Sequence, residues 1–137
     1  MEYINTPGYN AWRGNAFEIS CLNHIPQIKA ALGISGVSTQ EYAWRSRAFD
    51  PRAQIDLLID RKDGIINLCE MKYTDAVFEM NKEEYEKLMS RLDVFQKETS
   101  PGKAIHLTLI SVNGAKINKY SSVFQTQVSG DDLFRRP

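Results

Sequence analysis

The feature that most constrains the fold is a pair of apolar runs separated by a short turn. Residues 54–61 and 65–73 are rich in isoleucine and leucine, and Lys62-Asp63-Gly64 lies between them. An Asp-Gly step between two such runs is a strong signal for an antiparallel hairpin. The sequence therefore predicts two adjacent strands, and their apolar character indicates that both faces are covered.

The register of this hairpin decides whether its charged residues can meet. If Asp63 is the centre of a three-residue turn, Asp56 and Glu70 lie opposite each other on one face of the sheet. Lys72 then projects from the same face, with Gln54 across from it. A two-residue turn would separate the two carboxylates onto opposite faces. The sequence leaves both registers open, and a grouped site requires the first.

The remaining chain predicts helices on either side of these strands. Apolar residues at helical spacing extend over 13–32, where Pro26 predicts a kink near 23–26 or two consecutive helices. Asn81 with Glu84 three residues later is a capping box that starts another helix.

Two further extended stretches, 41–47 and 104–112, are typical of strands, and residues 100–102 end the second helix. The order helix, three strands, helix, strand predicts one α/β domain over residues 1–137, with a central mixed sheet.

Composition narrows the classes of protein. The 137 residues carry a formal net charge of zero, so the chain lacks the overall basic character of a stand-alone nucleic-acid binder. Two cysteines outside any CxxC spacing indicate buried free thiols rather than disulfides or zinc. We expect a cytoplasmic protein without a membrane span, since no apolar run approaches the ~20 residues that a span requires.

The grouped acids point to a metal site. Two facing carboxylates repel each other unless a cation lies between them or one is protonated. Mg²⁺, or Mn²⁺, prefers oxygen ligands, which Asp56, Glu70 and the Met71 carbonyl could supply together with a phosphate oxygen. Lys72 would orient the attacking water or stabilise charge on the phosphate. The alternative is that these charges form only a solvated strand face.

An Asp followed across a hairpin by Glu-x-Lys resembles the signature of the PD-(D/E)XK nuclease superfamily. The resemblance implies a restriction-endonuclease-like αβββαβ core and catalytic roles for Asp56, Glu70 and Lys72. A glutamate on the first helix often completes the acidic site in that family, and Glu18 is at the matching position. Ile55 replaces the usual proline, a departure that removes no ligand.

A closer resemblance covers almost the whole chain. Segments 12–18, 24–29, 32–34 and 131–134 are similar to the nuclease-like C-terminal domain of prokaryotic AAA-type ATPases. No P-loop GxxxxGK[ST] occurs here. The resemblance implies an isolated domain or a missing ATPase region, a possible ATPase partner, and DNA as the substrate, with RNA as the alternative.

Other polar residues allow two readings. His24, two turns from Glu18, is either structural or functional. A basic cluster around Trp44 either binds nucleic acid or protects a strand edge. Its members are Arg45, Arg47, Arg52, Arg61 and Lys62. A silent docking module of the same fold, and a purely structural domain, remain the alternatives to a nuclease.

Overall fold

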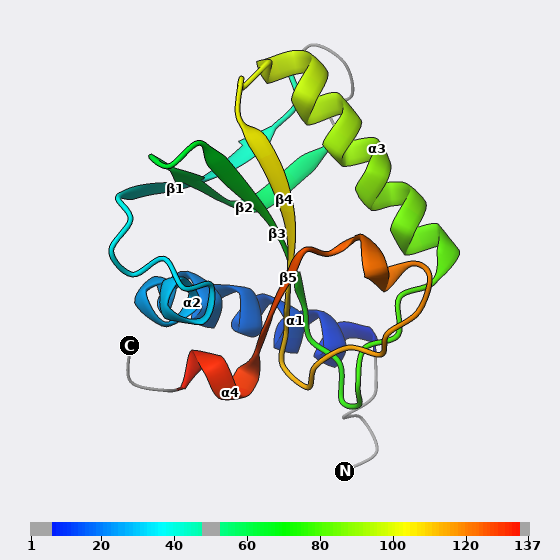
Figure 1. Ribbon diagram of the computed structural model, residues 1–137. Helices are drawn as coiled ribbons and strands as arrows, with labels where there is room; N and C mark the ends of the chain where they lie inside the picture. Colours follow the sequence, from blue (N-terminus) through cyan, green and yellow to red (C-terminus); the bar gives the residue numbers. More distant parts are fainter. Residues whose placement is uncertain (1–6, 48–52, 135–137) are drawn as a thin grey trace.

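A mixed five-stranded sheet forms the centre of the protein (Figure 1). The computed structural model describes residues 7–47 and 53–134, with side chains from residue 13 onward. The strands are β1 (Thr39–Arg45), β2 (Gln54–Arg61), β3 (Ile65–Lys72), β4 (Ala104–Ser111) and β5 (Thr126–Ser129). They lie side by side in chain order; β1, β2 and β3 are antiparallel, and β4 and β5 continue parallel to β3. The predicted α/β class with a mixed sheet is confirmed.

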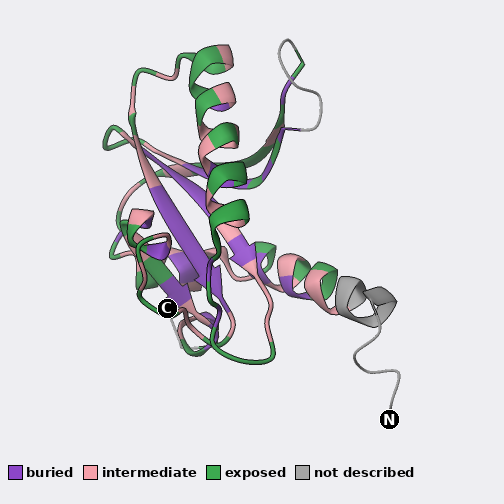
Figure 2. Cartoon of the chain, turned by 90° about the vertical axis from the view of Figure 1, so that its right-hand side faces the viewer, coloured by how far each residue is buried: buried purple, intermediate pink, exposed green. Residues whose placement is uncertain are grey.

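Helices cover both faces of the sheet. They are α1 (Pro7–Leu22), α2 (Ile25–Ala31), α3 (Lys82–Thr99) and α4 (Gly130–Leu133), together with the 3-10 turn η2 (Ser121–Val123). Phe17, Ile28 and Leu133 pack α1, α2 and α4 onto one face, and Leu88 and Phe95 pack α3 onto the other. Figure 2 shows the result, with buried residues concentrated in the strands and the outer side of α3 exposed.

The first predicted helix is two helices, as the proline indicated. Chain direction changes after Leu22, and Pro26 lies in the first turn of α2, where its missing N–H costs no helical hydrogen bond. The helix begins at Pro7 rather than at residue 13. His24 is the N-cap residue of α2.

The capping box of α3 is confirmed. The Glu84 backbone N–H donates to Asn81 Oδ1 at 2.8 Å, and the Asn81 backbone N–H donates to Glu84 Oε1 at 3.2 Å. These two bonds satisfy donors that have no partner within the helix. The helix ends at Ser100, which adopts the left-handed conformation with φ 43°.

Boundaries elsewhere differ slightly from the predictions. The first strand covers Thr39–Arg45 rather than 41–47, and β3 and β4 each end one residue early. β5 and α4 were not predicted, because four residues are too few to show a period.

The hairpin adopts the register that brings the acids to one end. Leu57 pairs with Cys69, and Lys62, Asp63 and Gly64 form a three-residue turn. Gly64 has φ +93°, the left-handed conformation that closes a turn of this kind.

Candidate active site

The β2–β3 hairpin opens at the end far from its turn. Pairing between the two strands ends at Leu57 and Cys69, whereas β3 continues to pair with β4 as far as Lys72. A β-bulge adds to the divergence, because the register of β1 with β2 shifts between Tyr42 and Trp44. Asp56 therefore lies just beyond the paired part of the hairpin, on the strand that bends away.

Glu70 is the most enclosed charged residue at this open end. Its side chain is 12% exposed and forms ion pairs with Lys72 Nζ at 3.7 Å and with Arg91 Nη2 at 2.9 Å. Lys72 also faces Glu84 Oε2 at 3.5 Å and lies 5.9 Å from the centre of the Phe78 ring. Glu70 and Lys72 thus project toward α3, because Phe78 belongs to the core on that side.

Asp56 departs from two expectations. It is exposed, although the apolar sequence around it indicated burial. Gln54 donates to Asp56 Oδ1 at 2.7 Å and accepts from Arg45 Nη2 at 2.6 Å, so it supports the carboxylate rather than Lys72. The expectation that Gln54 sits beside Lys72 is wrong, since β2 has bent away from β3 at this point.

Glu18 shares the electrostatic environment of these residues. Partial burial raises the pKa of its carboxyl, and the negative charges of Asp56 and Glu70 raise it further, while the ammonium group of Lys72 lowers it. Such effects between charges fade over about 10 Å in salt solution. The charges of Asp56 on β2 and of Glu70 and Lys72 on β3 therefore reach Glu18 on α1.

Side-chain contacts anchor helix α1 to the residues that directly follow β3. Arg13 donates to the Tyr73 hydroxyl and to Asp75, just after β3, and its guanidinium lies 4.4 Å from the centre of the Tyr73 ring. Phe17 contacts the same ring edge-on at 6.0 Å. These contacts, none of them predicted, hold the Glu18 turn against the end of β3.

The oxygen atoms at this site are of the chemical type that a hard cation such as Mg²⁺ prefers as ligands. Glu18, Asp56 and Glu70 offer carboxylate oxygens, and their mutual repulsion is what a divalent cation would relieve. Met71, whose carbonyl is the third predicted ligand beside Asp56 and Glu70, is buried in β3 next to Ile110. Within residues 13–47 and 53–134, no three His, Cys, Asp or Glu side chains converge closely enough to make a complete metal site by themselves. A cation here would also need backbone, water or phosphate oxygens.

The predicted basic cluster is not one patch. The β1–β2 register places Arg61 opposite Thr39 and Arg45 opposite Gln54, at opposite ends of the strand pair and about 20 Å apart by strand rise. Lys62 is exposed in the hairpin turn, beside Arg61.

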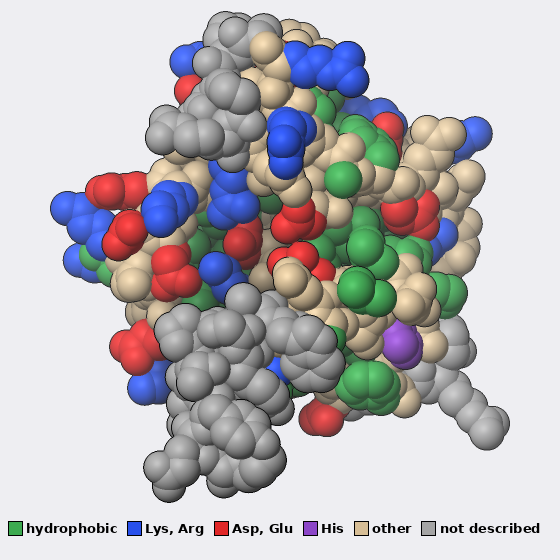
Figure 3. Space-filling view, turned by 180° about the vertical axis from the view of Figure 1, so that it is seen from behind, with side chains coloured by type: hydrophobic (Ala, Val, Ile, Leu, Met, Phe, Trp, Pro, Cys, Tyr) green, Lys and Arg blue, Asp and Glu red, His purple; other side chains and the backbone are tan. Residues whose placement is uncertain are grey.

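Arg45 and Arg47 remain together at the open end. With Ala43, Trp44 and Glu98 they line a surface hollow of about 590 Å³. Arg52 lies outside the described residues. On the face seen in Figure 3, described acidic and basic side chains are intermingled rather than separated into a basic surface.

His24 makes two contacts within the fold. Its Nδ1 lies 2.5 Å from the Ser20 carbonyl oxygen, and its ring contacts Phe134 edge-on at 5.5 Å. Its position at the cap between α1 and α2 accounts for both contacts.

Arg91 is the charged residue at the site that sequence reasoning missed. It lies three residues after Leu88 and four before Phe95, both of which are buried. A cation on the buried side of a helix signals an ionic partner, and that signal could have identified it.

Comparisons with known proteins bear on the fold alone. No family model matches the chain, and no curated protein matches it. A solved structure described as the crystal structure of a protein of unknown function, AF1548, is similar with a TM-score of 0.52 and 13% identity. The match covers 80% of this chain and 56% of that one, and it supports the α/β architecture. Among the described helices, none is long and apolar enough to cross a membrane.

Proposed function

We propose that the chain is a metal-dependent nuclease domain of the PD-(D/E)XK type that hydrolyses phosphodiester bonds of DNA. The observation that carries this proposal is the ion pair of Glu70 with Lys72 at the open end of the hairpin, together with the effect of Asp56, Glu70 and Lys72 on the pKa of Glu18. Three carboxylates and a lysine gathered from three separate elements are costly for stability and suited to phosphoryl chemistry.

The residues divide the work by charge. In hydrolysis, water oxygen attacks phosphorus, the bond to one ester oxygen breaks, and that oxygen takes up a proton. Lys72, held between two carboxylates, places a positive charge beside the phosphate as negative charge develops. Glu18, with its raised pKa, is suited to accept a proton from the attacking water.

A divalent cation, Mg²⁺ or Mn²⁺, fits the acidic residues. Asp56, Glu70 and the Met71 carbonyl would hold it, and Glu18 would support them. When bound, such an ion supplies Lewis-acid stabilisation of charge on the phosphate.

Attraction to DNA must be local, since the net charge is zero. Arg45 pairs with Gln54, two residues before Asp56, and lines the same surface hollow as Arg47, so these two arginines would contact a backbone phosphate. An ATPase partner, or an ATPase region joined to this domain, would supply further affinity. RNA is the alternative substrate, and the cytoplasm is the proposed location.

One observation favours a second function, a catalytically silent docking module of the same fold. Both oxygens of Glu70 already face cations of the protein itself, Lys72 and Arg91. Such pairing can be structural, with no demand for a metal.

Cleavage of single-stranded, duplex and branched DNA with Mg²⁺ or Mn²⁺ tests the proposal. Metal-dependent cutting that is lost in Asp56→Ala is the expected result. The melting temperature provides a second readout: the metal should raise it in the wild type and not in Asp56→Asn. Absence of both cutting and metal-induced stabilisation would leave the docking module as the better account.

A further inference from the structure

Helix α3 presents two charged side chains to the Glu-x-Lys motif, and each meets the opposite charge. Glu84 Oε2 lies 3.5 Å from Lys72 Nζ, and Arg91 Nη2 lies 2.9 Å from Glu70 Oε2. We propose that Arg91 is a positioning residue that orients Glu70 for metal binding. This inference rests on the proposed nuclease function and assigns that site a residue from outside the motif.

The spacing of the two elements matches the pairing. Glu84 and Arg91 are seven residues apart, about two helical turns, and so lie on one side of α3. Glu70 and Lys72 are two residues apart on β3 and so project from one face. Along α3 the acidic Glu84 comes before the basic Arg91, and along β3 the acidic Glu70 comes before the basic Lys72. Because the two orders run in opposite directions, each α3 residue lies beside a β3 residue of opposite charge.

The Arg91 contact engages one oxygen of Glu70 closely and leaves the other on the side of Lys72. Arg91 holds Oε2, whereas Oε1 faces Lys72 at a looser 3.7 Å. With exposed fractions of 29% for Arg91 and 12% for Glu70, the pair is only partly screened by water. A carboxylate anchored in this way keeps one orientation instead of sampling several.

Helix α3 is itself held rigidly, so that it can act as a reference for the motif. Glu84 caps the helix with Oε1 while its other oxygen faces Lys72. Leu88, between Glu84 and Arg91, and Phe95, one turn after Arg91, are both fully buried. Groups that orient metal-binding carboxylates commonly contribute 10–100-fold, roughly, to metal affinity or activity.

The test measures Mn²⁺ affinity by calorimetry in Arg91→Met, Arg91→Lys and the wild type. Methionine keeps an unbranched apolar side chain at position 91 of α3 but cannot donate a hydrogen bond or carry charge. We expect affinity about tenfold weaker in Arg91→Met, with partial recovery in Arg91→Lys, which restores one donor and the charge.

Lys87→Gln is the matched control. Lys87 lies on the same helix, 3.1 Å from Glu83 and 70% exposed, so this variant removes one positive charge from α3 without touching Glu70. Its Mn²⁺ affinity should equal that of the wild type. If Arg91→Met does not fold, Arg91→Gln replaces it with the same expected loss.

Two results would overturn the inference, and they differ. Unchanged or tighter Mn²⁺ binding in Arg91→Met, beside a wild type that binds Mn²⁺, would make the pair a structural contact or a competitor, and the nuclease proposal would stand. A wild type that binds no Mn²⁺ would remove the proposed metal site and this role of Arg91 together.

Discussion

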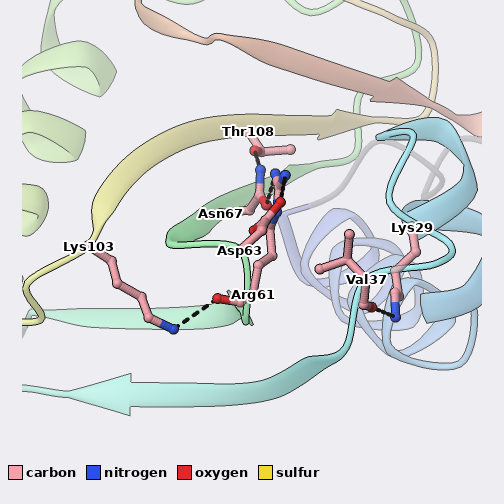
Figure 4. A network of polar contacts seen from close by, with 7 residues as sticks. All are labelled: Lys29, Val37, Arg61, Asp63, Asn67, Lys103 and Thr108. Carbon is pink, nitrogen blue, oxygen red and sulfur yellow. Dashed lines mark hydrogen bonds and ion pairs between the residues drawn. The ribbon is translucent and has the colours of Figure 1, made fainter.

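The turn end and the open end of the β2–β3 hairpin both bring acidic and basic side chains together, but the pKa of a carboxyl group shifts in opposite directions at the two ends. At the turn end, Arg61 Nη2 pairs with Asp63 at 2.6 Å and Lys103 Nζ donates to the Arg61 carbonyl oxygen at 2.8 Å (Figure 4). Lys103 Nζ also pairs with Asp60 at 2.5 Å. Hydrogen bonding from Arg61 lowers the pKa of Asp63. At the open end, burial and two neighbouring carboxylates raise the pKa of Glu18.

The difference shows which charges serve the fold. Each acid at the turn has its own base, and Asn67 continues the network inward to Thr108 at 3.0 Å. At the open end Lys72 and Arg91 both pair with Glu70, and the charges of Asp56 and Glu70 still raise the pKa of Glu18, so that negative charge around this carboxyl remains uncompensated. Uncompensated charge of one sign is unfavourable for folding and is a common mark of a functional site.

The largest expected effect is a difference in DNA cleavage between variants of Lys72 and Lys103, two lysines that each contact an acidic residue. Lys72→Ala should lower DNA cleavage by about 100-fold or more, because the charge next to the phosphate is lost. Lys103→Ala, at the turn, should leave cleavage unchanged once the protein is folded. Steady-state cleavage rates of both variants measure the contrast, and an equal loss in both would erase it.

The next effect is on stability alone. Asn67 is fully buried, donates to Thr108 Oγ1 and accepts from Arg61 Nη1 at 3.3 Å. Asn67→Ala removes two hydrogen bonds from a fully buried position and should lower the free energy of unfolding by about 1–3 kcal/mol. Urea unfolding measures the loss. Cleavage below the unfolding range should persist, and its disappearance there would tie the turn network to function.

Between the two ends of the hairpin, the buried thiols of Cys69 and of Cys21, which packs against it from α1, should be shielded from water. Burial raises the pKa of Cys21 to about 12 and that of Cys69 further still. Both thiols stay protonated in the folded state but ionise above their ordinary value of 9.0 when the chain unfolds. The unfolded state then binds fewer protons, so stability should fall as pH rises above that value, by roughly 1.4 kcal/mol per pH unit for each thiol.

Urea unfolding across the alkaline range checks this fall. Cys21→Ala combined with Cys69→Ala is the comparison, and the double variant should have a shallower alkaline slope whatever its stability at neutral pH, with the raised pKa of Tyr42 accounting for part of what is left. An identical slope in both proteins would contradict burial of the thiols.

The smallest effects should have opposite signs. Glu18→Gln should stabilise the protein at neutral pH, by less than about 1 kcal/mol, because it removes a repelled carboxylate that is still partly exposed. Asp63→Asn should destabilise it, because the Arg61 contact favours the charged form.

Melting temperatures as a function of pH check both signs. A raised folded pKa penalises the ionised form, so the gain in Glu18→Gln should vanish as pH falls to the ordinary glutamate value of 4.5. A lowered folded pKa stabilises above the ordinary aspartate value of 3.8, so the loss in Asp63→Asn should vanish at pH below it. If Glu18→Gln and Asp63→Asn changed the melting temperature in the same direction, the proposed electrostatic difference between the open end and the turn end would be contradicted.

Local signals in the sequence were sufficient for the main elements. The Lys62-Asp63-Gly64 turn predicted the hairpin, and Asn81 with Glu84 predicted the start of α3. The grouping of the basic residues failed, because proximity in sequence says nothing about the end of a strand pair at which a side chain lies. Arg91 was missed because its partner is on another element, 21 positions earlier in the chain.

By itself, the sequence determined the order of the main elements up to β4, the α/β class and the residues able to form an acidic site, since period, caps and turns are local properties of the chain. Only the tertiary structure decided that the hairpin opens at Leu57 and Cys69 and that α1 and α3 bring Glu18 and Arg91 to that opening. The physical reason is that charges interact through space. Their pKa values and pairings depend on burial and distance between elements, which packing sets.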